Sequence, residues 1–159
     1  LYSRKNPLEI HNWRKAISHV PQNIYLLDST IAENIAFGIP FSEIDLEKVK
    51  KAAIDSKIDH FINATKNKYL TKIGENGVKL SGGERQRIGI ARALYNNSKI
   101  IVFDEATSAL DDKTESKVIS SLNQLDKDLT VIIIAHRLTT LEICNRVLKV
   151  NGSKVNEIL

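Results

Sequence analysis

Two short stretches of this chain carry residue types that could bind phosphate and activate water. Residues 80–86 read LSGGERQ and place a serine and two glycines where a helix is predicted to begin. Residues 100–105 read IIVFDE, an apolar run that ends in two carboxylates. A helix N-terminus offers unpaired N–H groups and about half a positive charge, which favour a phosphate. Two carboxylates can hold a divalent cation and polarise a water molecule. Together the stretches predict chemistry on a phosphate group within one compact unit.

The two glycines of the first stretch are unfavourable in a helix, so their presence there needs a physical explanation. Ser81, with Glu84 three residues further on, fits a capping box at a helix N-terminus. Gly82 and Gly83 in the first turn each lower helix stability by about 1 kcal/mol relative to alanine. Close approach of a phosphate would explain that cost, because glycine has no side chain to keep the ligand away. The alternative is a helix that simply begins at a favourable cap.

The second stretch opens a predicted strand–helix–strand unit. The apolar runs at residues 100–103 and 131–134 are typical of parallel strands covered on both faces. Such a unit is right-handed, and ligands of open parallel sheets bind beyond the carboxyl ends of the strands. Asp104, Glu105 and His136 are therefore expected at one edge of the sheet. The helix between the strands is predicted from an apolar face at helical spacing, made by Val118, Ile119, Leu122 and Leu125.

The polar residues at these strand ends are candidates for catalysis. Asp104 could hold Mg²⁺ through its water shell, and Glu105 could polarise a water against a γ-phosphate. A neutral imidazole at His136 could hydrogen-bond the γ-phosphate and hold the attacking water in line, although a lone histidine at a strand end is ordinarily structural. Gln22 follows Pro21 at another predicted strand end, which by itself indicates nothing. Asp111 could cap the next helix.

The remaining sequence is organised around these motifs. Residues 13–20 suggest a strand that runs into a loop, and residues 29–97 have a mostly helical pattern. Gly74 and Gly77 interrupt that pattern before the glycine-rich helix. Residues 138–150 predict a short helix and then a strand, followed by turn residues at 151–152.

Composition narrows the class of protein. The chain has 159 residues, a size that suits one ordinary domain, and a net charge of +4 that is scattered, so no nucleic acid partner is expected. Cys144 is the only cysteine, which excludes a disulfide framework within the chain. The chain has no methionine and begins at Leu1, so we expect a piece of a longer protein. No G-x-x-x-x-G-K-[ST] motif, the loop that cradles nucleotide phosphates, occurs in it.

Taken together, these stretches resemble the motifs of ABC-type ATPases. Residues 80–86 resemble the signature motif, residues 100–105 the Walker B motif and residues 108–111 the D-loop; Gln22 and His136 are similar to the family's Q-loop glutamine and its histidine. The resemblance covers essentially the whole chain. It implies an α/β fold: a partial P-loop NTPase (RecA-like) core with a parallel sheet, plus the ABC α-helical subdomain. Residues 1–159 would be one partial nucleotide-binding domain, with 29–97 as the helical subdomain and 1–28 and 98–159 in the core.

The resemblance also implies a role for each candidate residue. Glu105 would be the general base and His136 the γ-phosphate contact, while Asp104 would organise Mg²⁺. Gln22 would be an Mg²⁺ ligand and a sensor of an attached membrane domain. The other residues would act between two copies that sandwich ATP: Ser81, Gly82 and Gly83 against the γ-phosphate held by the other copy's Walker A motif, and Asp111 in the D-loop that crosses to that copy.

Two further stretches favour the exporter subset of the family. Residues 29–35, STIAENI, and residues 73–77, IGENG, look like exporter sequences, the second like the loop used against intracellular coupling helices. The implied function is the ATP-hydrolysing domain of an ABC exporter at the cytoplasmic face of the cell membrane. Its cofactors would be ATP and Mg²⁺, and its partners a second nucleotide-binding domain and a transmembrane domain. Without a Walker A motif, these residues alone are expected to be inactive.

Two alternatives stay open. A soluble ABC ATPase acting on nucleic acid or ribosomes is one, but the compact segment between Gln22 and Ser81 leaves no room for a coiled-coil insertion. A non-catalytic, regulatory nucleotide-binding domain is the other, and the presence of both Glu105 and His136 argues against it.

Overall fold

The chain builds a small parallel sheet with helices stacked on one side of it. The computed structural model describes residues 16–107, 109–123, 129–135, 141, 144–152 and 154–158. Three parallel strands lie in the order β1-β2-β3: β1 (Ile17–Val20), β2 (Ile100–Asp104) and β3 (Thr130–Ile134). In register, Val20 lies beside Phe103, and Asp104 lies beside Ile134. The predicted β–α–β unit with parallel strands is therefore confirmed.

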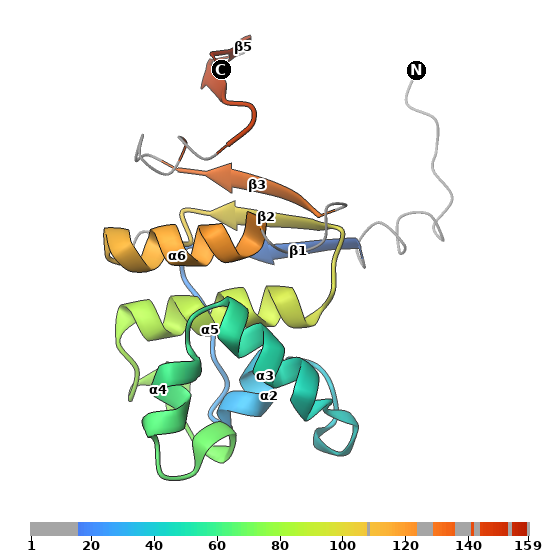
Figure 1. The fold of residues 1–159 in the computed structure, drawn as a ribbon, viewed down its shortest axis with the longest axis vertical. Coiled ribbons are helices and arrows are strands. Elements are labelled where there is room, and N and C mark those ends of the chain that lie inside the picture. The colour runs from blue at the N-terminus through green and yellow to red at the C-terminus, as the bar shows by residue number, and fades with distance from the viewer. Residues whose placement is uncertain are drawn as a thin grey trace.

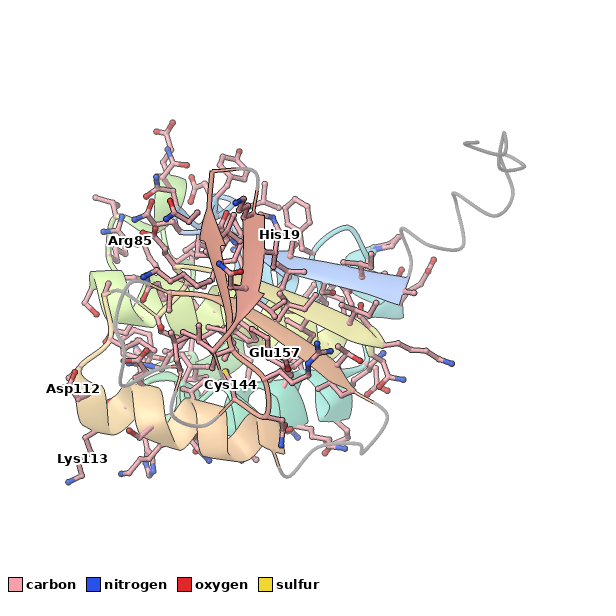
Figure 2. All side chains as sticks on the ribbon, turned by 90° about the horizontal axis from the view of Figure 1, so that it is seen from above. His19, Arg85, Asp112, Lys113, Cys144 and Glu157 are labelled. Atoms are coloured by element: carbon pink, nitrogen blue, oxygen red, sulfur yellow. The ribbon has the colours of Figure 1, made fainter. Side chains whose placement is uncertain are left out.

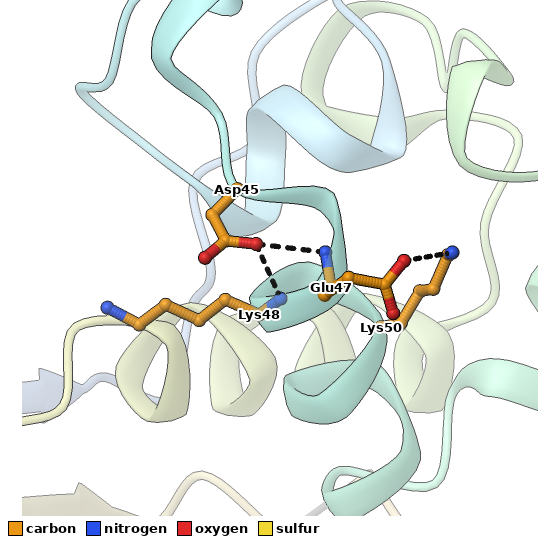
Figure 3. A network of polar contacts seen from close by, with 4 residues as sticks. All are labelled: Asp45, Glu47, Lys48 and Lys50. Carbon is orange, nitrogen blue, oxygen red and sulfur yellow. Dashed lines mark hydrogen bonds and ion pairs between the residues drawn. The ribbon is translucent and has the colours of Figure 1, made fainter.

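Most of the α-helices begin at a residue whose side chain caps the first turn. Thr30 and Ser81 each form a capping box, and the Asp45 carboxylate accepts from the N–H groups of Glu47 and Lys48 at 3.0 and 3.1 Å (Figure 3). The α-helices are α2 (Ile31–Ile35), α3 (Leu46–Asp55), α4 (Asp59–Ala64), α5 (Gly82–Tyr95) and α6 (Asp112–Asn123). Three short 3₁₀ turns are η1 (Phe41–Glu43), η2 (Lys68–Leu70) and η3 (Glu75–Gly77).

Helix α5 is shared by two apolar cores. On one face, its residues Ile88 and Ala91 are buried with the side chains of α2, α3 and α4. On another face, its residues Ile90 and Ala93 are buried against the sheet, together with Phe103. Figure 1 shows α5 directly beneath the strands, with α2, α3 and α4 below it. A helix that is apolar on more than one face packs between two layers, so α5 ties the helical layer to the sheet.

The expectation that β2 and β3 are covered on both faces is wrong. Burial alternates along β2, where Ile101 and Phe103 are buried, and along β3, where Ile132 and Ile134 are 47% and 49% exposed. The described helices lie on one side of the sheet (Figure 1), so only the side chains that point to that side are fully covered. The apolar runs are of the right kind for parallel strands, but the sequence does not reveal which face is covered.

A β-hairpin stands on the other side of the sheet. It pairs β4 (Leu148–Asn151) with β5 (Lys154–Glu157), and Gly152 takes a positive φ of 58° at the turn. The predicted strand and the turn at 151–152 are confirmed, whereas the returning strand was not predicted. Seen from that side, the hairpin lies in front of the sheet (Figure 2). Arg146 supports it with two hydrogen bonds to the Glu157 carboxylate, of 2.9 and 3.0 Å.

Candidate functional site

The carboxyl ends of β1 and β2 bring Gln22 and Glu105 together. Gln22 follows the end of β1 by two residues, and Glu105 follows β2 directly. Gln22 Nε2 donates a hydrogen bond of 2.8 Å to Glu105 Oε2. An amide thus holds one carboxylate oxygen at the edge of the sheet where ligands of parallel sheets bind.

The backbone at Glu105 is unusual. Its φ is +50°, in the left-handed region that non-glycine residues seldom adopt. Its N–H donates to the carbonyl oxygen of Ile134 at 3.0 Å, which connects the end of β2 to the end of β3. Such conformations cost about 1–3 kcal/mol and cluster at functional sites, where surrounding contacts hold them in place. Four other described non-glycine residues also have a positive φ, so this conformation alone does not distinguish Glu105; they are Lys57, Lys68, Asn76 and Asn97.

Asp104 has a neighbour that the sequence analysis did not identify. His19 Nε2 lies 3.6 Å from Asp104 Oδ2, and both side chains are about half exposed. Figure 2 shows His19 near the end of β1. The signal that could have found this pair is strand alternation. Val20 and Phe103 are buried on one face, so His19 and Asp104 both belong to the opposite face.

Ser81 caps α5 as the sequence predicts. Its Oγ accepts from Glu84 N–H at 3.3 Å, and Glu84 Oε2 accepts from Ser81 N–H at 2.8 Å. The first turn of α5 therefore starts at Gly82, with the N–H groups of that turn at the helix end.

Gly83 has a packing role beside its proposed ligand role. A Cβ on Gly83 would lie 3.3 Å from the carbonyl oxygen of Ala109, a tight approach, whereas a Cβ on Gly82 would make ordinary van der Waals contact with the Ala109 side chain at 3.5 Å. Buried Gln86 reinforces this approach, since its Oε1 accepts from Ala109 N–H at 3.0 Å. The start of α5 thus rests on the loop that follows Glu105, and Gln86 is a structural residue that sequence reasoning missed.

Asp111 performs the capping role considered for it. Its carboxylate accepts from Thr114 N–H at 3.0 Å at the start of α6. Hydrogen bonds from the Thr114 hydroxyl and N–H lower the pKa of the Asp111 carboxyl below its ordinary value. His136 and Ser108 lie outside the described residues, so the structure places neither of them.

Comparison with known proteins identifies the family. A protein-family model described as "ABC transporter" matches residues 2–108. The chain is 45% identical over 150 residues to an "ATP-dependent lipid A-core flippase" of Saccharophagus degradans, covering 94% of this chain and 25% of that protein. It is 44% identical over 151 residues to the "ABC transporter ATM1" of Toxoplasma gondii, covering 95% of this chain and 13% of that protein. A solved structure titled as a bacterial Atm1-family ABC exporter with ATP bound superposes with a TM-score of 0.79 at 42% identity, over 85% of this chain and 24% of that one.

The fold and site define part of a P-loop NTPase core with a helical layer attached. The chain belongs to the ABC transporter family. It spans about a quarter of the length of the flippase it matches. Within the part that the structure describes, no helix has both the length and the apolar character to cross a membrane.

Proposed function

We propose that this chain is part of the ATP-binding and ATP-hydrolysing domain of an ABC exporter. The hydrogen bond between Gln22 and Glu105 is the observation that supports this most, because it joins two predicted site residues 83 positions apart. The names of similar proteins also support the proposal, since one is an ATP-dependent flippase and another an exporter with ATP bound.

In this proposal Glu105 is the general base. Its carboxylate takes the proton of a water that attacks the γ-phosphate of ATP. The amide of Gln22 orients the carboxylate, and its own carbonyl oxygen is available to a metal ion. His136 contacts the γ-phosphate.

The donor set fits Mg²⁺ that is bound together with a nucleotide. Mg²⁺ commonly takes one or two carboxylates and completes its shell with water and phosphate oxygens. Asp104 supplies a half-exposed carboxylate, and Gln22 supplies an amide oxygen. Among the described residues no group of three or more His, Cys, Asp or Glu side chains could hold a metal alone. When bound, the ion would neutralise charge on the phosphates.

The remaining site residues act between two copies of the domain. Ser81, Gly82 and Gly83 present the N-terminus of α5 to the γ-phosphate bound by the other copy. Asp111 ends the loop that crosses to that copy. A transmembrane domain is the second partner, which places the domain at the cytoplasmic face of the cell membrane. Residues 29–97 form the helical subdomain, and the flanking residues belong to the core.

A test of the proposal is the Mg²⁺ dependence of ATP hydrolysis by the complete protein. Asp104→Asn should raise the Mg²⁺ concentration needed for half-maximal hydrolysis, because it removes the carboxylate that organises the ion. Asp59→Asn, which changes an aspartate on α4, is the matched control. Unchanged Mg²⁺ dependence in Asp104→Asn, or no ATP hydrolysis by the unaltered complete protein, would reject the proposal.

A further inference from the structure

The segment after Gln22 lies directly on the middle of α5. A Cβ built on Gly89 would lie 2.5 Å from Cδ1 of Ile24 and 2.9 Å from its Cγ1. Cβ atoms in proteins essentially never show contacts below 3.0 Å, so Ile24 occupies the space that the Cβ of any other residue at position 89 would fill. Glycine inside a helix costs about 1 kcal/mol relative to alanine. The close approach of Ile24 gives that cost a reason.

Arg92 holds the same segment one turn further along α5. Its Nη1 donates to the carbonyl oxygen of Tyr25 at 3.1 Å, and its Nε donates to that of Asn34 at 2.9 Å. The guanidinium also stacks over the Phe37 ring, 4.5 Å from the ring centre. Because both acceptors are main-chain carbonyls, these contacts constrain the path of the backbone itself.

The burial of Arg92 carries a cost in free energy. Arg92 Nη2 is buried and has no hydrogen-bond partner within the described part of the chain. A buried donor without a partner loses its hydration, at a cost of about 1–3 kcal/mol. The other contacts of the Arg92 guanidinium, its two hydrogen bonds to main-chain carbonyls and its stacking on Phe37, must offset this cost.

Asn34 fixes the far end of the segment. Its side chain is fully buried, accepts from Leu27 N–H at 2.8 Å and donates to Leu27 O at 3.1 Å. Contacts at Ile24, Tyr25 and Leu27 therefore hold the backbone immediately after Gln22. Gln22 itself is exposed, and its side chain donates a hydrogen bond to Glu105.

We propose that Gly89 and Arg92 are positioning residues for Gln22: they form a seat on α5 that keeps Gln22 in reach of Glu105. The seat consists of Gly89 and Arg92 with Ile24 and Tyr25 upon them. The same helix begins at Ser81–Gly83, so the seat also sets how far Gln22 lies from the phosphate-binding end of α5. The effect on catalysis rests on the proposed function, whereas the effect on the segment does not.

The first test compares Arg92→Lys with Arg146→Lys in the complete protein. Each of these arginines makes two hydrogen bonds, which the ammonium group of a lysine cannot reproduce because it lacks the planar guanidinium fork. Arg146 is the matched control because its bonds lie in the β4–β5 hairpin and not in the seat. Arg92→Lys should raise amide hydrogen exchange of residues 22–27, and it should lower kcat roughly fivefold to tenfold with KM for ATP unchanged, as expected for coupled neighbours. Equal behaviour of the two variants would overturn the proposal.

Combining Arg92→Lys with Gln22→Ala distinguishes an effect on the position of Gln22 from a general loss of stability. If Arg92 acts through Gln22, Arg92→Lys should cause no further fall in kcat once Gln22 is alanine. Independent, multiplying losses of kcat would overturn the proposal.

A second pair of variants, at Gly89 and Ile24, tests the packing contact of the seat and leaves Arg92 unaltered. Gly89→Ala should displace Ile24 and raise exchange of residues 22–27. Adding Gly89→Ala to Ile24→Ala should then have no further effect, because the clash has been removed. Additive effects on exchange would overturn the proposal. If the complete protein hydrolyses no ATP, the proposed function fails, and the exchange measurements still decide whether the seat exists.

Discussion

Gln22 and Glu105 are joined by a 2.8 Å hydrogen bond across 83 positions of sequence. The parallel pairing of β1 with β2 brings them together, since it aligns the carboxyl ends of the two strands. Glu105 is also held by its own N–H, which bonds to Ile134. One hydrogen bond thus holds the Glu105 carboxylate and another holds its backbone, so both are positioned by the surrounding fold.

Replacing Glu105 with glutamine should nearly abolish ATP hydrolysis by the complete protein while nucleotide stays bound. The amide keeps an oxygen that can accept from Gln22, but it cannot take a proton from water. General-base assistance is worth roughly 10²–10⁴ in rate. Phosphate release and retained nucleotide can be measured on the same sample. Hydrolysis within about tenfold of the unaltered protein would remove Glu105 from the role of base.

The 159 residues alone should bind MgATP weakly or not at all. The Walker A loop and its lysine supply most of the grip on the β- and γ-phosphates, and no such motif occurs in this sequence. Isothermal titration calorimetry measures this directly. Low-micromolar affinity would contradict the prediction.

The outer edge of β3 should cause this chain to self-associate. Among the described strands β3 pairs only with β2, and Ile132 and Ile134 are about half exposed. An unpaired edge beside apolar side chains is a template for pairing with another chain. Ile132→Lys should shift sedimentation toward monomer. Val78 is another exposed apolar residue, 75% exposed and outside the sheet, so Val78→Lys is the control and should not shift sedimentation. A clean monomer of the unaltered chain at all concentrations would refute this.

Glu33 should make the stability of this chain depend on acid pH. Hydrogen bonds from the Ser29 and Thr30 hydroxyls, together with the Thr30 N–H, lower the pKa of the Glu33 carboxyl below its ordinary 4.5. A lowered pKa stabilises the folded state above about pH 4.5, and that contribution is lost as pH falls through the folded-state pKa.

Urea unfolding between pH 3 and 7 can test this contribution. At neutral pH, Glu33→Gln should unfold at a lower urea concentration than the unaltered chain. Its free energy of unfolding should also fall less as the pH is lowered, because the contribution of the ionised Glu33 is already absent. Glu43→Gln, which alters an exposed glutamate in η1, is the control. The same acid dependence in Glu33→Gln and the unaltered chain would show that these hydrogen bonds contribute nothing measurable.

Local chemistry in the sequence determined much of the fold. The caps at Ser81 and Asp111, the apolar runs of β2 and β3 and the turn at Gly152 were all predictable, because each depends on residues within a few positions of one another. The two motif stretches were enough to indicate the family and the candidate carboxylates.

Only the tertiary structure decided the relationships between distant segments. It placed His19 beside Asp104, Gly83 against Ala109 and Ile24 upon Gly89, and it left Ile132 and Ile134 of β3 half exposed. Periodicity and caps report how a segment folds, but they do not report which other segment packs against it. That choice depends on how the helical layer and the sheet share α5, since the burial of each side chain is set by the whole arrangement of layers.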